Sequence, residues 1–133
     1  MDNETIEGFA RYRLNKAKET LETAKMILNE GKDFTSANNR AYYAIFYAIR
    51  AVLAIEETDF KRHKDAVAYF NKTYVASGRV SREVGKRLGR IKIVCEDSDY
   101  SEFYIASVED VAKQYESACF ILEEIKKYLP TMI

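Results

Sequence analysis

Four polar or aromatic side chains recur along one stretch of the chain at spacings of three, four and three residues. They are Arg40, Tyr43, Tyr47 and Arg50. On an α-helix this spacing places them along one face. Two arginines among so many apolar neighbours are costly unless they meet solvent, an anion or a carboxylate. Because guanidinium groups are well shaped to hold phosphate, one interpretation is a phosphate-binding surface. The alternative is that both arginines pair with acidic residues of another helix.

A second candidate is His63, the only histidine, which lies in the basic run Lys61–Lys64. Positive neighbours disfavour a further positive charge, so the sequence predicts a neutral imidazole. A neutral imidazole can accept a proton as a general base. The alternative is a helix-end or surface histidine without a chemical role.

A third feature is a basic stretch from Arg79 to Lys92, in which Glu83 is the only acidic residue. Four of its side chains are predicted to share one helical face: Arg79, Arg82, Lys86 and Arg90. Such a stripe could follow a phosphate backbone or dock an acidic partner. It could equally be a solvated face, and the sequence leaves these alternatives open.

Other classes of site find no support in the sequence. With one histidine, and with Cys95 and Cys119 far apart, no zinc site and no other metal site is expected. Gly85 and Gly89 lie inside a helical pattern without the strand that a phosphate-binding loop follows, so no cofactor is expected either. Enzyme chemistry would have to come from polar side chains carried by helices.

The elements that must position these residues are helices. Apolar residues recur every three or four positions in five segments, at about 5–29, 36–55, 61–74, 81–95 and 107–129. We expect Thr35 or Ser36 to cap the second helix, Asp59 the third and Ser107 the fifth, and Glu96–Tyr100 to form a loop. Short connections predict an all-α fold, an antiparallel four- to five-helix up-and-down bundle that forms a single domain over residues 1–133.

Composition limits the function further. Hydrophobic residues make up 47% of the 133 residues and charged residues 32%, with a formal net charge of zero. Bulk attraction to nucleic acid is therefore not expected, and binding would need a local patch. No apolar run approaches the roughly 20 residues that span a bilayer, so no membrane partner is expected. The acidic N-terminus and the two lone cysteines indicate a cytoplasmic protein.

The segment from Asn39 to Leu53, NRAYYAIFYAIRAVL, resembles the signature helix of the HEPN superfamily, in its small prokaryotic branch. His63 and the Asp99–Tyr100 pair resemble later motifs of the same branch. The resemblance implies an all-α homodimer that pairs with a minimal nucleotidyltransferase in a toxin–antitoxin system. Catalytic HEPN proteins cleave RNA without a metal, using an arginine followed a few residues later by a histidine.

The resemblance also assigns roles to residues. Arg40 would grip the scissile phosphate, while Tyr47 occupies the position where relatives of this branch often carry histidine. A tyrosine near its usual pKa of about 10 is a poor general base at neutral pH, so His63 would have to act from another helix. The candidate catalytic residues are Arg40, Tyr47 and His63. The candidate binding residues are Asn39, Tyr43, Arg50, Arg79, Arg82, Lys86 and Arg90.

Three functions remain after these observations. The first is a HEPN-like toxin of a toxin–antitoxin pair, acting as a metal-independent endoribonuclease with an altered motif. The second is a non-catalytic HEPN module that binds a nucleotidyltransferase and also nucleotide or RNA. A structural protein that associates only with itself is a third alternative, because the ten tyrosines offer material for an interface.

Overall fold

The structure, a computed structural model, describes the backbone of residues 3–100 and 107–132, and the side chains of residues 4–91 and 107–132. Its α-helices are α1 (Asn3–Glu30), α2 (Phe34–Ile55), α3 (His63–Phe70), α4 (Arg82–Tyr100) and α5 (Val108–Tyr128). A π-helical turn, η1 (Asn71–Val75), continues α3, and a 3-10 turn, η2 (Leu129–Met132), follows α5. No β-strand occurs within these ranges, and the predicted all-α bundle is confirmed.

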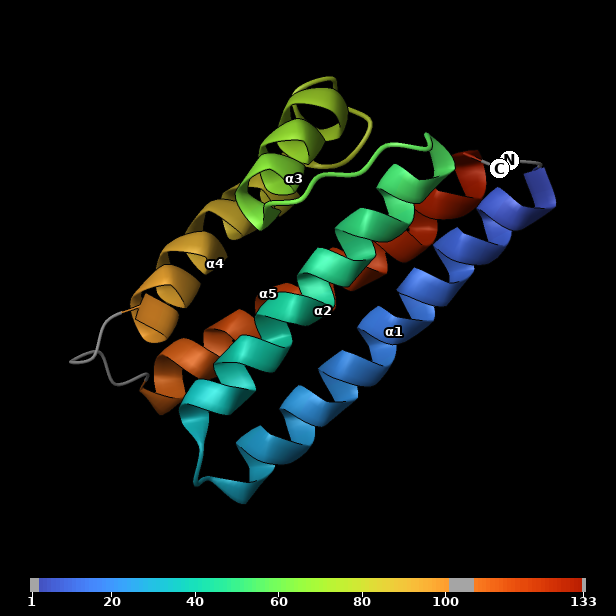
Figure 1. The fold of residues 1–133 in the computed structure, drawn as a ribbon. Helices are drawn as coiled ribbons and strands as arrows, with labels where there is room; N and C mark the ends of the chain where they lie inside the picture. The colour runs from blue at the N-terminus through green and yellow to red at the C-terminus, as the bar shows by residue number, and fades with distance from the viewer. Residues whose placement is uncertain (1–2, 101–106, 133) are drawn as a thin grey trace.

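Helix α2 is the centre of the bundle, because α1, α3, α4 and α5 all pack against it. Figure 1 shows α2 between α1 and α4, with α5 behind it and α3 near the end of the bundle. Helices α1 and α4 run opposite to α2, whereas α5 runs in the same direction (Figure 1). A hydrogen bond of 2.9 Å from Gln114 Nε2 to the Asn38 carbonyl oxygen joins the N-terminal parts of α5 and α2.

Small side chains allow this central position. Five alanines of α2 are each at most 1% exposed: Ala37, Ala41, Ala44, Ala48 and Ala51. Ala37 packs with Val111 of α5, so the absence of a long side chain lets the two helices approach closely. The burial of these alanines shows that they serve close packing around α2. None of the described helices, α2 included, is long and apolar enough to cross a membrane.

The caps differ from the prediction at two helices. The N-cap residue of α2 is Asp33, whose carboxylate accepts a hydrogen bond from the Ser36 backbone N–H at 3.0 Å, so neither Thr35 nor Ser36 has this role. Ser107 caps α5 as predicted, accepting from the Asp110 backbone N–H at 3.1 Å. The loop predicted over Glu96–Tyr100 is wrong, because α4 continues to Tyr100. That segment is polar, but it contains no proline or glycine that would end a helix.

The connection between α2 and α3 turns the chain back over α2. The Thr58 N–H donates to the Leu53 carbonyl at 3.1 Å and the Glu57 N–H to the Ala54 carbonyl at 3.0 Å, which is the Schellman pattern of a helix end. Glu57 holds the left-handed position of this turn, with φ of 55°. Asp59 does not cap α3, because α3 begins only at His63 and its N-cap residue is Arg62.

The turn η1 lies close to α4. A Cβ atom added at Gly85 would come within 2.9 Å of the Val75 Cγ1 atom, whereas one added at Gly89 would have nothing within 4 Å. At Gly85, therefore, α4 packs against η1 with no room for a methyl group. At Gly89, one turn farther along α4, a methyl group would meet no neighbouring atom. This contact fixes α4 beside the π-helical turn that follows α3.

Candidate functional site

The aromatic face of α2 receives His63. The imidazole lies over the Phe46 ring, with centroids 3.7 Å apart and planes inclined by 34°. It also contacts the rings of Tyr42 and Tyr43, whose centroids lie 5.6 and 5.5 Å from its own. We call these side chains, together with Arg50, the His63 cluster. His63 is half-buried, as a helix-end residue packed against a neighbouring helix should be.

The surroundings of His63 favour its neutral form. Burial, followed by the positive charge of Arg50, lowers the pKa of His63 below its ordinary value of 6.5. The neutral imidazole was predicted, but the predicted cause, the run of basic neighbours in sequence, is not the one that acts. The Tyr42 hydroxyl lies 3.2 Å from Nδ1 in a hydrogen bond, which fixes the ring and leaves Nε2 for other contacts.

Arg50 is held by a carboxylate from the connection between α2 and α3. Its Nε donates to Asp59 Oδ1 at 3.1 Å, and its Nη2 forms a second, short contact with Oδ2. Arg13 of α1 lies 3.9 Å from the same Oδ2 and donates to the Arg50 carbonyl at 3.2 Å. Burial works against ionised Asp59, but these hydrogen bonds and charges outweigh it and lower the pKa of Asp59 below its ordinary value of 3.8.

The two arginines of α2 therefore differ. Arg50 pairs with an acidic residue, as one of the two interpretations expected, although that residue lies in a connection and not on a helix. Arg40 makes no ion pair with any carboxylate of the described side chains, and its guanidinium lies 4.9 Å from the centroid of the Tyr43 ring. Tyr43 in turn contacts His63, so a single ring links Arg40 to the imidazole.

The remaining predicted residues of α2 lie farther from His63. Tyr47 is half-buried, and its ring centroid lies 6.4 Å from that of Tyr43, so it joins the His63 cluster only through that residue. Asn39 is half-buried, and its Oδ1 is buried without a hydrogen-bond partner among the described residues. Because this oxygen is buried, it presents almost no surface to a ligand, and the binding role of Asn39 stays a prediction.

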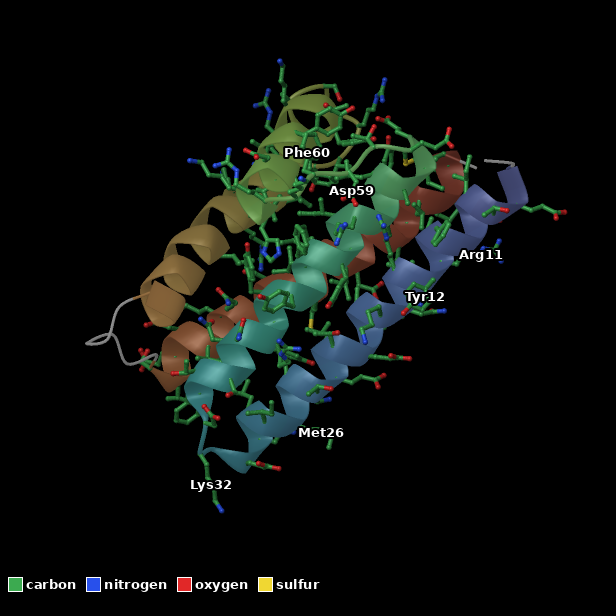
Figure 2. All side chains as sticks on the ribbon, viewed as in Figure 1. Arg11, Tyr12, Met26, Lys32, Asp59 and Phe60 are labelled. Carbon is green, nitrogen blue, oxygen red and sulfur yellow. The ribbon has the colours of Figure 1, made fainter. Side chains whose placement is uncertain are left out.

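A pocket of about 270 Å³ opens beside His63. It is lined by Phe46, Arg50, Asp59, Phe60, Lys61 and His63. Figure 2 shows Asp59 beside α2 and Phe60 beside α3, in the connection that forms one wall. Where side chains are described, no group of three or more histidine, cysteine, aspartate or glutamate residues could hold a metal ion.

The basic residues near α4 lie apart from this pocket, and none of them lines it. Arg82, Lys86 and Arg90 are exposed on α4, and Arg79 is exposed in the turn that precedes the helix. We call these four the α4 stripe. Arg87, in the same stretch, points inward: it pairs with Glu83 at 3.1 Å, donates to Ser117 Oγ at 3.3 Å and lies over the Phe120 ring.

Some residues of this site escaped the sequence reasoning. Tyr42 and Phe46 share a face of α2 at a spacing of four residues, but nothing in their spacing says that a histidine will cover them. The sequence predicts Asp59 as a helix cap and gives no role to Arg13. One signal was available, because Arg50 near the end of α2 needs an acidic partner. Three acidic residues follow that helix directly: Glu56, Glu57 and Asp59.

Comparison with known proteins gives the family. The model of the HEPN domain matches residues 10–128. A UPF0332 protein of Thermotoga maritima is 32% identical over 123 residues, which cover 92% of each chain. A Methanocaldococcus jannaschii protein named "Putative toxin" is 30% identical over 131 residues, or 98% of this chain and 96% of that one. A second protein of that organism with the same designation is 26% identical over 117 residues, covering 87% and 78%. This chain belongs to the HEPN domain family.

Proposed function

We propose that this protein is the toxin component of a toxin–antitoxin pair and that it cleaves RNA without a metal ion. The observation that carries the proposal is a half-buried histidine with a lowered pKa, linked through Tyr43 to an arginine without a described carboxylate partner. A neutral imidazole can accept the proton of the ribose 2′-hydroxyl, and a guanidinium can stabilise the charge on the phosphate, which are two tasks in metal-independent RNA cleavage. The names of the two Methanocaldococcus relatives support the toxin role.

The chemistry assigns one task to each group. With the proton of His63 on Nδ1, facing the Tyr42 oxygen, Nε2 carries a lone pair and accepts the proton of the 2′-hydroxyl. The 2′ oxygen attacks the adjacent phosphorus, and the bond from phosphorus to the 5′ oxygen breaks. Water returns a proton to that oxygen, which leaves a 2′,3′-cyclic phosphate and a 5′-hydroxyl. Arg40 neutralises charge on the phosphate, and Tyr47 orients it by hydrogen bonding.

The proposal includes the assembly in which this occurs. We propose a homodimer, a minimal nucleotidyltransferase as the antitoxin, and a cytoplasmic location, with residues 1–133 acting as one domain. The exposed α4 stripe offers a surface for an acidic partner or for the backbone of a substrate RNA. The two uses are separable, since a partner requires a fixed contact surface and RNA requires only positive charge.

Arg40→Ala tests the catalytic proposal directly. We expect purified protein to cleave single-stranded RNA in the presence of a chelator, and Arg40→Ala to slow this by about 100-fold or more, because one oxyanion-stabilising donor is worth that much. Arg11→Ala is the matched control, since it removes an exposed arginine of α1 that belongs to neither the His63 cluster nor the α4 stripe. A folded protein that leaves a broad panel of RNA sequences intact would contradict the proposal.

A second function is a non-catalytic module that binds a nucleotidyltransferase and also nucleotide or RNA. Two observations favour it: Tyr47 replaces the histidine of the usual motif, and the α4 stripe has no ion pairs with described carboxylates. Co-purification with a co-expressed minimal nucleotidyltransferase should be lost when Arg82 and Lys86 become Glu. Retention of the complex in that variant would rule out the stripe as the docking surface.

A further inference from the structure

The carboxylate in the pocket beside His63 has no oxygen left to offer a ligand. Asp59 Oδ1 accepts from Arg50 Nε at 3.1 Å and from the Phe60 backbone N–H at 2.9 Å. Its Oδ2 contacts Arg50 Nη2 and lies 3.9 Å from Arg13. Both oxygens of the only carboxylate in the pocket are thus already engaged. A ligand that donates hydrogen bonds would find neither oxygen of Asp59 available there.

The aromatic walls are also covered. Phe46 is 4% exposed, with the His63 ring at 3.7 Å and the Arg50 guanidinium at 5.4 Å from its ring centroid. Phe60 packs against Tyr69, with centroids 5.2 Å apart. A nucleobase stacks on an open ring face, and these contacts leave little of either ring for it. The pocket is therefore not suited to a base.

What the pocket does offer is positive charge. Lys61 is exposed and makes no ion pair with any carboxylate whose position is described, and Arg50 keeps Nη1 after using Nε and Nη2 for Asp59. Arg13 stands behind Arg50 in the same network. Three cations against the single charge of Asp59 leave a surplus of two positive charges. An anion with several acceptor oxygens fits these donors, which is the chemistry of a phosphate group.

This phosphate cannot be the one held by Arg40. Arg40 and Arg50 are ten residues apart on α2, so their Cα atoms lie about 15 Å apart at a rise of 1.5 Å per residue. Two cationic positions along one helix, with His63 over the aromatic residues between them, match the repeated charges of a nucleic-acid strand better than one small anion.

We propose that the pocket formed by Arg50, Lys61 and His63 binds a phosphate group of single-stranded RNA, separate from the phosphate at Arg40. The proposal rests on the proposed function in that it takes RNA as the ligand. It assigns Lys61, which no motif singled out, a direct contact with the RNA backbone. The proposal also gives Asp59 a positioning role, because its carboxylate holds the Arg50 guanidinium at the wall of the pocket.

His63 makes the test direct, because the chain has no other histidine and the imidazole Hε1 resonance needs no assignment. We would measure the pKa of His63 by NMR alone, with inorganic phosphate, and with a 2′-O-methyl RNA oligonucleotide whose blocked hydroxyl prevents cleavage. An anion bound beside the ring favours the imidazolium, so both probes should raise the pKa of His63. Lys61→Ala should weaken oligonucleotide binding about fivefold, the equivalent of about 1 kcal/mol. Lys64→Ala, which removes an exposed charge from the same basic run, should leave it unchanged.

The outcomes separate this proposal from catalysis. A pKa that stays constant with both probes overturns it, and so does an equal loss of affinity in Lys61→Ala and Lys64→Ala. A response to inorganic phosphate alone also overturns it, since the pocket would then accept a small anion and not a strand. If the pKa rises with both probes while unmodified RNA stays intact, the phosphate pocket stands and the proposed cleavage fails. If RNA is cleaved while the pKa of His63 stays constant, the proposed cleavage stands and the phosphate pocket is overturned.

Discussion

The His63 cluster and the α4 stripe both concentrate polar side chains, but they hold them differently. In the cluster, His63 is fixed by the Tyr42 hydroxyl and the Phe46 ring, and Arg50 by Asp59. In the stripe, the side chains extend into solvent without ion pairs to the carboxylates that the structure describes. Chemistry on a single atom needs fixed geometry, whereas long-range attraction needs only charge. The difference fits the proposal that the cluster acts on a substrate RNA and that the stripe attracts it.

The largest expected effect distinguishes these two tasks. His63→Ala should slow RNA cleavage by about 100-fold to 10,000-fold, the range associated with loss of a general base. Arg82→Ala should weaken RNA binding only a few-fold at low salt, and the difference should vanish at high salt because exposed charges are screened. Cleavage rates and binding constants at two salt concentrations would check both. Equal losses of cleavage in the two variants would remove the distinction between the regions.

A smaller effect tests how rigidly α4 is held against the element that follows α3. Gly85→Ala should lower the free energy of unfolding by about 1–3 kcal/mol, because the new methyl group would meet Val75. Gly89→Ala is the matched control: it has open space, and it should raise the free energy of unfolding by up to about 1 kcal/mol through helix propensity. Urea denaturation measures both. A stabilising Gly85→Ala would mean that η1 shifts easily away from α4.

The smallest effect concerns pH. The folded protein holds the pKa of His63 below 6.5, so the unfolded chain binds more protons just below that pH. The stability tied to neutral His63 is therefore present above pH 6.5 and is lost as pH falls through its lowered pKa. The lowered pKa of Asp59 also makes stability fall as pH falls, but only below the ordinary aspartate pKa of 3.8. Thermal unfolding between pH 7.5 and 5 should show the loss in the wild type, and His63→Gln should lack it. Lys86→Ala, in the stripe, should behave like the wild type.

The sequence predicts the fold well because the fold depends on periodic burial. The five helices and the buried alanines of α2 follow from spacing, and the structure has them. Helix ends were less predictable. Asp33 competes with Thr35 and Ser36 for the same cap, and local sequence does not decide between neighbouring candidates. The polar end of α4 looked like a loop because polarity indicates exposure, which helices also tolerate.

The candidate site was predictable only in part. The spacing of Arg40 and Tyr43 gives one face of α2, and the solitary histidine stands out in any sequence. Their contact through Tyr43 depends on how the connection returns over α2, which no helical period encodes. For the same reason, Asp59 could be recognised as a possible helix cap but not as the partner of Arg50.

The Schellman turn at Glu57 also has a consequence for the length of this connection. Five residues, 58–62, lead from the turn to His63, and α3 is anchored beyond them by its own packing against α2. One inserted residue adds up to about 3.5 Å of chain, more than the tolerance of a hydrogen bond such as that between Tyr42 and His63. Insertions and deletions between Glu57 and His63 should therefore be selected against more strongly than substitutions. A relative with a different number of residues here would need another histidine, or another base, at this site.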